Sequence, residues 1–142
     1  MNKSVLHRAI ALLARREHGE KELSRKLQQK GFEADDIREV MTFLLDNDYQ
    51  SDIRYADSVF RSRISKGYGW LYIKQELAQK GIATAIVSGL NTEQIDWYDQ
   101  AQLAYNKRFG DSPVLDQKDK AKRVRFLQGR GFDFDQIMAV IK

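Results

Sequence analysis

The sequence contains no cysteine, one proline and two histidines among its 142 residues. Without cysteine the chain can form no disulfide and no thiolate metal site, and it has no cysteine nucleophile. Such a chain suits a reducing compartment, so we expect it to be cytoplasmic. Its first residues run into charge without a long apolar core, so we expect neither a secretory signal nor a membrane partner.

Catalytic motifs are missing too. The two histidines, His7 and His18, both fall in or at the end of the first predicted helix, and no nucleophile elbow, phosphate loop or dinucleotide fingerprint occurs. The acidic pairs Asp35-Asp36 and Asp46-x-Asp48 are interpreted as helix-terminal charges and caps, because no further metal ligands surround them. We therefore expect no enzymatic activity, no cofactor and no metal site.

The composition that remains is that of a folded protein. Hydrophobic residues make up 42% and charged residues 31%, which is too apolar for a disordered chain and too charged for a membrane span. The net charge is +4. Acidic and basic residues balance within positions 1–48, so the positive excess lies in the rest of the chain. This charge permits a polyanionic partner.

An internal repeat organises the chain. Gly31, Gly81 and Gly131 stand fifty residues apart, each after a basic residue and before a large apolar one. Three further columns keep the same spacing: Leu27, Leu77 and Leu127; Ile37, Val87 and Ile137; Val40, Leu90 and Val140. A self-similar unit of this length predicts a repeat architecture.

Within each unit the apolar residues recur every three to four positions, as in Ile37, Val40, Met41 and Leu44, which predicts helices. The predicted helices span about 4–17, 20–30, 34–47, 52–65, 70–80, 83–91, 93–109, 116–129 and 134–141. The expected N-caps are Ser51, Thr92 and Asp133, the last in a capping box with Gln136. The three repeated glycines are expected to close helices in the left-handed conformation.

We therefore predict an all-α fold of three tandem three-helix, helix-turn-helix-like repeats. Their boundaries are placed at 1–48, 49–92 and 93–142. A unit of this size buries too little apolar surface to be stable alone, so the repeats are expected to pack on one another into an elongated, curved body.

Two stretches carry the candidate binding residues. The first holds Arg61, Arg63, Lys66 and Lys74 together with Tyr68 and Trp70, a combination that could hold phosphates while a ring stacks on a base. The same rings could equally be packing residues. On the second stretch Lys118, Lys122 and Arg125 share a helix face while Arg123 points elsewhere, which fits a phosphate-tracking surface or a solvated face.

The helical hairpins leave several functions open. The second and third helices of each unit have the form of a helix-turn-helix, which DNA-binding proteins and protein-binding solenoids share. A tandem transcription regulator is one alternative, but two of the third helices begin with acidic residues that phosphates would repel, near Asp35 and Asp135. A helical protein-protein adaptor is the other.

The repeat and its motifs resemble the RecX family of bacterial regulators that modulate the RecA recombinase. The similarity covers nearly the whole chain and rests on residues 11–23, Lys26-Leu27, Lys30-Gly31-Phe32, Asp52-x-Arg54-Tyr55-Ala56, Arg63 to Lys66-Gly67-Tyr68-Gly69, Ile73-x-x-Glu76-Leu77-x-x-Lys80-Gly81-Ile82, and Lys118-x-Lys120-x-Lys122-x-x-x-Phe126-Leu127-x-x-Arg130-Gly131-Phe132. Gly19 departs from the family pattern, which often has a capping serine there.

The resemblance implies a non-enzymatic regulator that binds RecA and its filaments on single-stranded DNA. Members of the family limit filament extension and suppress strand exchange, ATPase and coprotease activities, which links them to DNA repair, recombination and the SOS response. The expected partners are RecA, its nucleoprotein filament and single-stranded DNA, with double-stranded DNA left open. We expect a monomer.

Overall fold

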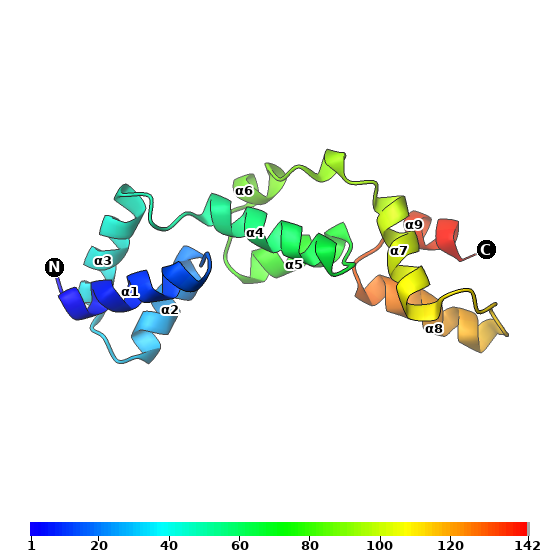
Figure 1. Cartoon of the computed structure of the whole chain (residues 1–142), viewed down its shortest axis with the longest axis horizontal. Helices are drawn as coiled ribbons and strands as arrows, with labels where there is room; N and C mark the ends of the chain where they lie inside the picture. The colour runs from blue at the N-terminus through cyan, green and yellow to red at the C-terminus, as the bar shows by residue number, and fades with distance from the viewer. Residues whose placement is uncertain (142) are drawn as a thin grey trace. The chain divides into compact units, whose positions relative to one another are not determined.

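The computed structural model describes residues 1–141, and in that range it is wholly helical (Figure 1). The α-helices are α1 (Lys3–Arg15), α2 (Glu20–Gln29), α3 (Ala34–Asp46), α4 (Asp52–Ser65), α5 (Trp70–Gln79), α6 (Thr84–Ser88), α7 (Trp97–Phe109), α8 (Gln117–Gly129) and α9 (Phe134–Val140), with a 3₁₀ helix at Thr92–Gln94. The all-α class and the order of the predicted helices are confirmed.

The seventh helix begins later than predicted. Thr92 starts the short 3₁₀ helix, and α7 begins only at Trp97. The cap of α7 is Asp96, whose side chain accepts from the Asp99 backbone N–H at 3.0 Å. The prediction of Thr92 as this cap was therefore wrong. The chain turns between the two sites so that the indole N–H of Trp97 can donate to the Thr92 carbonyl at 3.1 Å.

The other predicted caps are confirmed. Asp133 and Gln136 form the capping box of α9, and the Ser51 hydroxyl accepts from the Arg54 backbone N–H at 3.2 Å. The repeated glycines after α2, α5 and α8 all have positive φ, between 79° and 97°. An L-residue with a side chain rarely adopts this conformation, which explains glycine at these turns.

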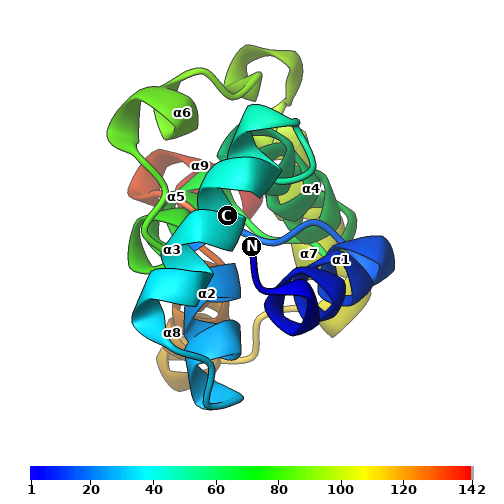
Figure 2. The same cartoon turned by 90° about the vertical axis from the view of Figure 1, so that its left-hand side faces the viewer.

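The chain divides into two compact units, which we call the first unit (residues 1–58 and 77–88) and the second unit (59–76 and 89–142). In the first unit α1, α2 and α3 contact one another (Figure 2). Their buried side chains form one apolar core. Its fully buried side chains include Val5, Leu23, Leu27 and Leu44. The apolar faces predicted from the periodicity point into this core.

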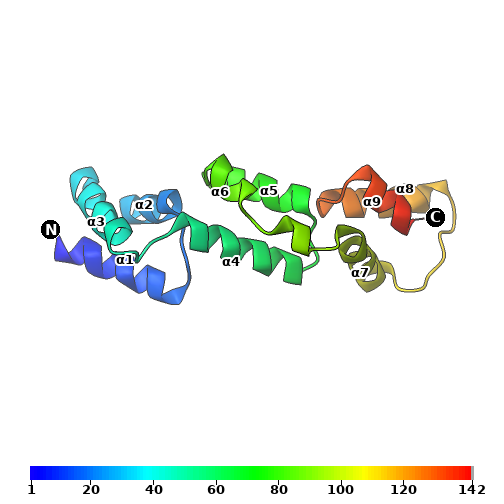
Figure 3. The same ribbon diagram turned by 90° about the horizontal axis from the view of Figure 1, so that it is seen from above.

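The second unit has a core of its own. Helices α7, α8 and α9 contact one another, and Figure 3 shows them grouped at the C-terminal part of the chain. Ala101 and Leu127 are fully buried there, with Phe132 and Ile137 almost so. Leu127 and Ile137 belong to the fifty-residue columns, so the repeat pattern marks core positions.

A junction between the start of α2 and later residues organises the first unit. A side chain at Gly19 would lie within 3.2 Å of the Tyr55 ring, so glycine fits where a serine would crowd that ring. The missing cap is supplied from elsewhere, because the Asp52 carboxylate accepts from the Glu20 backbone N–H at 2.8 Å. Buried Gln50 donates to the His18 carbonyl at 3.2 Å.

The equivalent junction in the second unit is made by backbone against backbone. The Gly69 N–H donates to the Arg130 carbonyl at 2.6 Å, and the Leu71 N–H donates to the Gly131 carbonyl at 3.1 Å. A Cβ on Gly131 would overlap the backbone of Tyr72. Glycine is therefore required here twice over, for its positive φ and for the close approach of α5.

This difference in surroundings predicts unequal effects of the same substitution. Gly31 has no atom near its missing side chain, so Gly31→Ala should cost only the left-handed conformation, about 1–2 kcal/mol in the free energy of unfolding. Gly131→Ala has the same conformational cost and must also displace α5. It should therefore lower the free energy of unfolding by at least about twice as much. Urea unfolding of both variants measures the two values.

Gly129 provides the matched control, because it lies at the end of α8 with open space around it. Gly129→Ala should leave the stability unchanged or raise it slightly, as alanine favours the helix. Equal losses for Gly31→Ala and Gly131→Ala would contradict the structural role of the junction.

Candidate functional site

All nine candidate binding residues fall in the second unit, on three neighbouring parts of the chain. Arg61 and Arg63 lie on α4, with Lys66 and Tyr68 just after it; Trp70 and Lys74 lie on α5; Lys118, Lys122 and Arg125 lie on α8.

Helix α8 presents its cations as the helical spacing predicts. Lys118, Lys122 and Arg125 are exposed, whereas Arg123 is only 4% exposed. The Arg123 guanidinium donates to the Tyr105 hydroxyl at 2.6 Å and to the Ser112 carbonyl at 2.8 Å. Arg123 therefore holds the loop before α8 in place, and the exposed cations of the same helix remain on its outer side.

Arg63 is engaged inside the unit. Its guanidinium donates to both carboxylate oxygens of Glu76, at 2.7 and 2.8 Å, and both side chains are largely buried. The hydrogen bond with Glu76 raises the pKa of Arg63 against the opposing effect of burial. This bidentate pair ties α4 to α5 and leaves the guanidinium directed at a carboxylate of the same chain.

The two aromatic candidates also have partners. Trp70 packs edge-on against Phe60 and lies 6.3 Å from the Trp97 ring centroid. Tyr68 stacks on Tyr72 with the centroids 4.3 Å apart. Base stacking by either ring would compete with these contacts.

Next to the end of α4 the structure assembles a site that the sequence did not reveal. A cavity of about 330 Å³ is lined by residues from the ends of α4 and α8 and from α7. Among the described residues, its lining includes no acidic side chain and four cationic ones: Lys66, Lys107, Arg108 and Arg130. Only Lys66 among them was predicted. The others were missed because they belong to helices far from it in sequence and converge only through the fold.

Stacking against aromatic rings holds the arginines of this region in place. The Arg130 guanidinium carbon lies 4.5 Å from the Tyr68 ring centroid and 5.2 Å from that of Phe126. Arg108 lies 5.8 Å from the same Phe126 ring and 5.2 Å from Phe109. Arg130 also donates to the Lys66 carbonyl at 3.1 Å. Stacking uses the faces of the guanidinium groups, whereas their N–H donors lie along the edges, where an anion binds.

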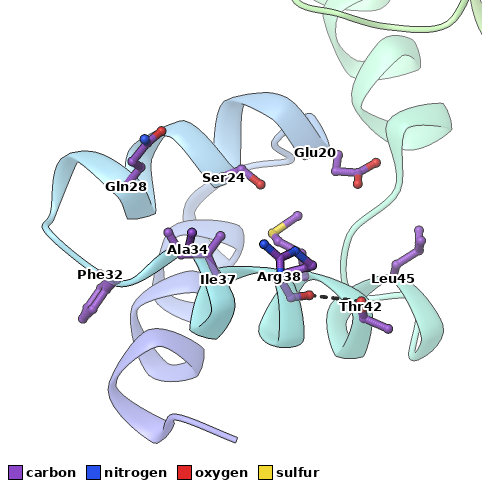
Figure 4. Close-up of a pocket in the computed structure, with 10 residues that line it drawn as sticks. Glu20, Ser24, Gln28, Phe32, Ala34, Ile37, Arg38, Thr42 and Leu45 are labelled. Carbon is purple, nitrogen blue, oxygen red and sulfur yellow. Dashed lines mark hydrogen bonds between the residues drawn. The ribbon is translucent and has the colours of Figure 1, made fainter.

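The first unit contains a different cavity, between α2 and α3 (Figure 4). It measures about 420 Å³ and has Phe32, Ile37 and Met41 among its walls. Glu20 and Arg38 contribute one charge of each sign, and Arg38 is already paired with Asp35 at 2.8 Å. This groove therefore lacks the charge bias of the cavity in the second unit.

A buried histidine lies near the end of α1. His18 is 2% exposed, its Nδ1 lies 3.0 Å from the Arg16 carbonyl, and its Nε2 lies 3.0 Å from the Lys26 ammonium. A carbonyl only accepts and an ammonium only donates, so the ring is neutral with its proton on Nδ1. Burial, followed by the charges of Arg16 and Lys26, lowers the pKa of His18, and these effects outweigh the hydrogen bond to Arg16 and the charge of Glu22.

Residues 1–141 contain no cluster of three histidine, aspartate or glutamate side chains that could hold a metal ion. None of the helices in that range is long and apolar enough to span a membrane. Asp35 and Asp36 lie in the first turn of α3, and Asp48 pairs with Arg54 at 2.9 Å. The acidic pairs thus serve helix ends and local ion pairs.

Comparison with known proteins gives one family for all three repeats. Residues 6–44 match the family described as RecX, first three-helix domain; residues 51–88 match the second three-helix domain and residues 94–141 the third. The chain is 47% identical over 130 residues to the regulatory protein RecX of Vibrio campbellii, covering 91% of this chain and 84% of that protein. It is 42% identical over 133 residues to the regulatory protein RecX of Acidithiobacillus ferrooxidans, covering 94% and 85%.

Solved structures agree on the fold. The crystal structure of RecX from Lactobacillus salivarius superposes with a TM-score of 0.77 at 23% identity, covering 98% of this chain and 93% of that one. A second structure, described as regulatory protein RecX, gives a TM-score of 0.79 at 20% identity, covering 97% of this chain and 70% of the other.

The ion pair between Arg63 and Glu76 predicts a measurable coupling. In a double-mutant cycle with Arg63→Ala and Glu76→Ala, the interaction energy should be about 1–3 kcal/mol, because the pair is bidentate and largely buried. The exposed pair of Arg38 and Asp35 is the control, and its coupling should not exceed about 0.5 kcal/mol. Equal coupling in the two cycles would show that Arg63 is not held by Glu76.

The buried histidine predicts a pH dependence of stability. The unfolded chain takes up a proton near pH 6.5, whereas folded His18 does so only at lower pH. The stabilisation that comes from keeping His18 neutral should therefore be complete above about pH 6.5. The free energy of unfolding should fall as the pH drops below that value toward the lower pKa of the folded state. Urea unfolding between pH 7.5 and 5 measures the loss, in roughly half-unit steps.

His18→Gln should abolish this pH-dependent loss of stability. His7→Gln, at an exposed position on α1, should leave the loss unchanged. The ion pair of Glu22 with Arg16 does not confuse the result. Burial alone would raise the pKa of Glu22, but Arg16 holds it below its usual value, so that pair loses stability only at more acidic pH. A wild-type curve that stays flat down to pH 5 would contradict the neutral buried histidine.

Proposed function

The chain belongs to the RecX family, and from this premise we propose that it is a non-enzymatic regulator that binds RecA and RecA filaments on single-stranded DNA. In this proposal it limits filament extension and thereby lowers strand exchange, ATPase and coprotease activity. The relatives it matches are named regulatory proteins. Residues 1–48, 49–92 and 93–142 are the three proposed sequence repeats, a division distinct from the two compact units. In this proposal the protein acts as a cytoplasmic monomer.

One observation in the structure carries the proposed binding surface. In the part of the chain that the structure describes, the second unit combines a cavity lined by four cations and no acidic residue with an exposed row of cations on α8. Both DNA phosphates and an acidic protein surface are attracted to such a surface, and salt weakens either interaction. The candidate residues that serve this role are Lys66, Lys74, Lys118, Lys122 and Arg125, all of which are exposed.

The remaining candidates take supporting roles in the proposal. Arg63 keeps α4 and α5 together through Glu76, and Tyr68 and Trp70 lie in aromatic contacts within the unit. DNA contact therefore proceeds through phosphates rather than through stacked bases. Arg61 has interactions of its own within the chain and stays a candidate contact.

A tandem helix-turn-helix transcription regulator fits the surface less well. The first turns of α3 and α9 carry Asp35, Asp36 and Asp135. These carboxylates would meet phosphates if the helices entered a DNA groove, and the resulting repulsion opposes binding.

The test is ATP hydrolysis by RecA on single-stranded DNA, with the protein titrated well below one molecule per RecA. We expect strong inhibition under conditions in which fluorescence anisotropy shows the DNA itself to be far from saturated. Lys118→Glu with Lys122→Glu should weaken inhibition about tenfold or more, because each reversal replaces attraction by repulsion. The matched control is Arg25→Glu with Lys30→Glu, two exposed cations on and just after α2.

Two outcomes would overturn the proposal. Inhibition that appears only when the protein covers the DNA would mean simple competition for the strand. No inhibition at any ratio, with DNA binding absent as well, would favour an adaptor for another protein.

A further inference from the structure

The cavity in the second unit has chemistry beyond its positive charge. Its walls include apolar side chains from three helices, namely Ile64 from α4, Leu103 and Ala104 from α7, and Phe126 from α8. Leu103 is 58% exposed, although it is a large apolar residue in a helix. We call these four apolar residues the floor of the cavity, and the cations line the same cavity.

These two properties select a class of ligand. An aliphatic floor gains free energy only when it covers an apolar group, and a phosphate or sugar provides none. A nucleobase is bound best by an open aromatic face. Phe126 is the one aromatic residue that lines the cavity within residues 1–141, and Arg108 and Arg130 already lie over its ring, at 5.8 and 5.2 Å. The floor therefore suits an aliphatic or aromatic side chain of a protein better than a base.

The cations specify what surrounds that side chain. The cations that line the cavity are Lys66, Lys107, Arg108 and Arg130, and no acidic residue within 1–141 lines it. Arg130 is positioned by Tyr68 and by the Lys66 carbonyl, so its guanidinium is oriented before a ligand arrives. Carboxylates on both sides of an inserted apolar residue would pair with these groups, which is the charge complementarity of an acidic peptide.

We propose that this cavity binds a segment of a protein partner in which one large apolar side chain is flanked by acidic residues. The apolar side chain occupies the floor at Leu103 and Phe126, and the carboxylates meet the surrounding cations. The proposal rests on the proposed function in one respect, since it makes RecA the protein that supplies the segment. The exposed cations of α8 then remain available for DNA.

The first experiment measures the affinity of the wild-type protein for two labelled synthetic peptides. Both are acidic, one has a central phenylalanine, and the other has glycine in its place. We expect the phenylalanine peptide to bind at least about fivefold more tightly, as expected for one buried anchor. Equal affinity for the two peptides would contradict the proposed role of the apolar floor. If neither peptide binds, the cavity is not a peptide site.

The second experiment uses variants with intact folds, because the changed side chains lie on the surface. Leu103→Ala should weaken binding of DNA-free RecA about five- to tenfold, and Leu115→Ala is the control at a residue that is 81% exposed and outside the cavity. Lys107→Gln should weaken the same binding about two- to fivefold, with Lys30→Gln as its control.

Affinity for a labelled oligothymidylate separates a protein site from a nucleic-acid site. Leu103→Ala should change it less than about twofold, since the anchor contributes nothing to phosphate binding. If Leu103→Ala weakens oligothymidylate and RecA equally, the cavity serves nucleic acid and the proposal fails.

The proposed function can fail separately. A wild-type protein that does not bind or inhibit RecA, yet prefers the phenylalanine peptide, would keep the cavity as a peptide site and remove RecA as its partner.

Discussion

The second unit depends on one close approach of backbone to backbone, where the start of α5 meets the turn after α8. The Gly69 N–H reaches the Arg130 carbonyl at 2.6 Å, and Gly131 leaves no room for a side chain against Tyr72. This contact joins residues about sixty positions apart. Because the Arg130 backbone is fixed through its carbonyl, its guanidinium lies over the Tyr68 ring and lines the cavity. The cationic site is thus a product of the junction rather than of one helix.

The first unit has a corresponding junction at the start of α2. Residues that form the two junctions stand fifty positions apart, which explains the period of the repeat. Gly19 and Gly81 stand fifty residues before Gly69 and Gly131, and Gln50 stands fifty before Gln100. Gln50 donates to the His18 carbonyl, and Gln100 donates to the carbonyls of Ile64 and Tyr68. The fifty-residue spacing is therefore kept between the residues that form the junctions. Outside the junctions the loop lengths vary, because loops tolerate insertions and deletions.

Features that depend on neighbouring residues were predictable from the sequence. Helix faces, the capping box at Asp133 and the left-handed glycines all follow from local chemistry. Thr92 and Asp96 are two cap-forming residues four positions apart, and local sequence does not choose between them. In the structure Asp96 caps α7, and the Trp97 indole donates to the Thr92 carbonyl. The exposure of Lys118 and Lys122 was predictable from helical spacing. The engagement of Arg63 by Glu76 was not, because the pairing of helices determines it and residue spacing does not.

The cations of the second unit differ in their contacts, and that difference separates two parts of recognition. Arg130 is held by an aromatic ring and a carbonyl, so little side-chain entropy is left to lose on binding, and a ligand must match its position. Lys118 and Lys122 are exposed, and exposed lysines attract a polyanion over a distance without fixing its geometry. Attraction through the lysines depends on salt throughout, whereas fit at the cavity depends on shape as well as charge. Both kinds of cation lie in the second unit, and the junction at Gly131 fixes the position of the more tightly held one, Arg130.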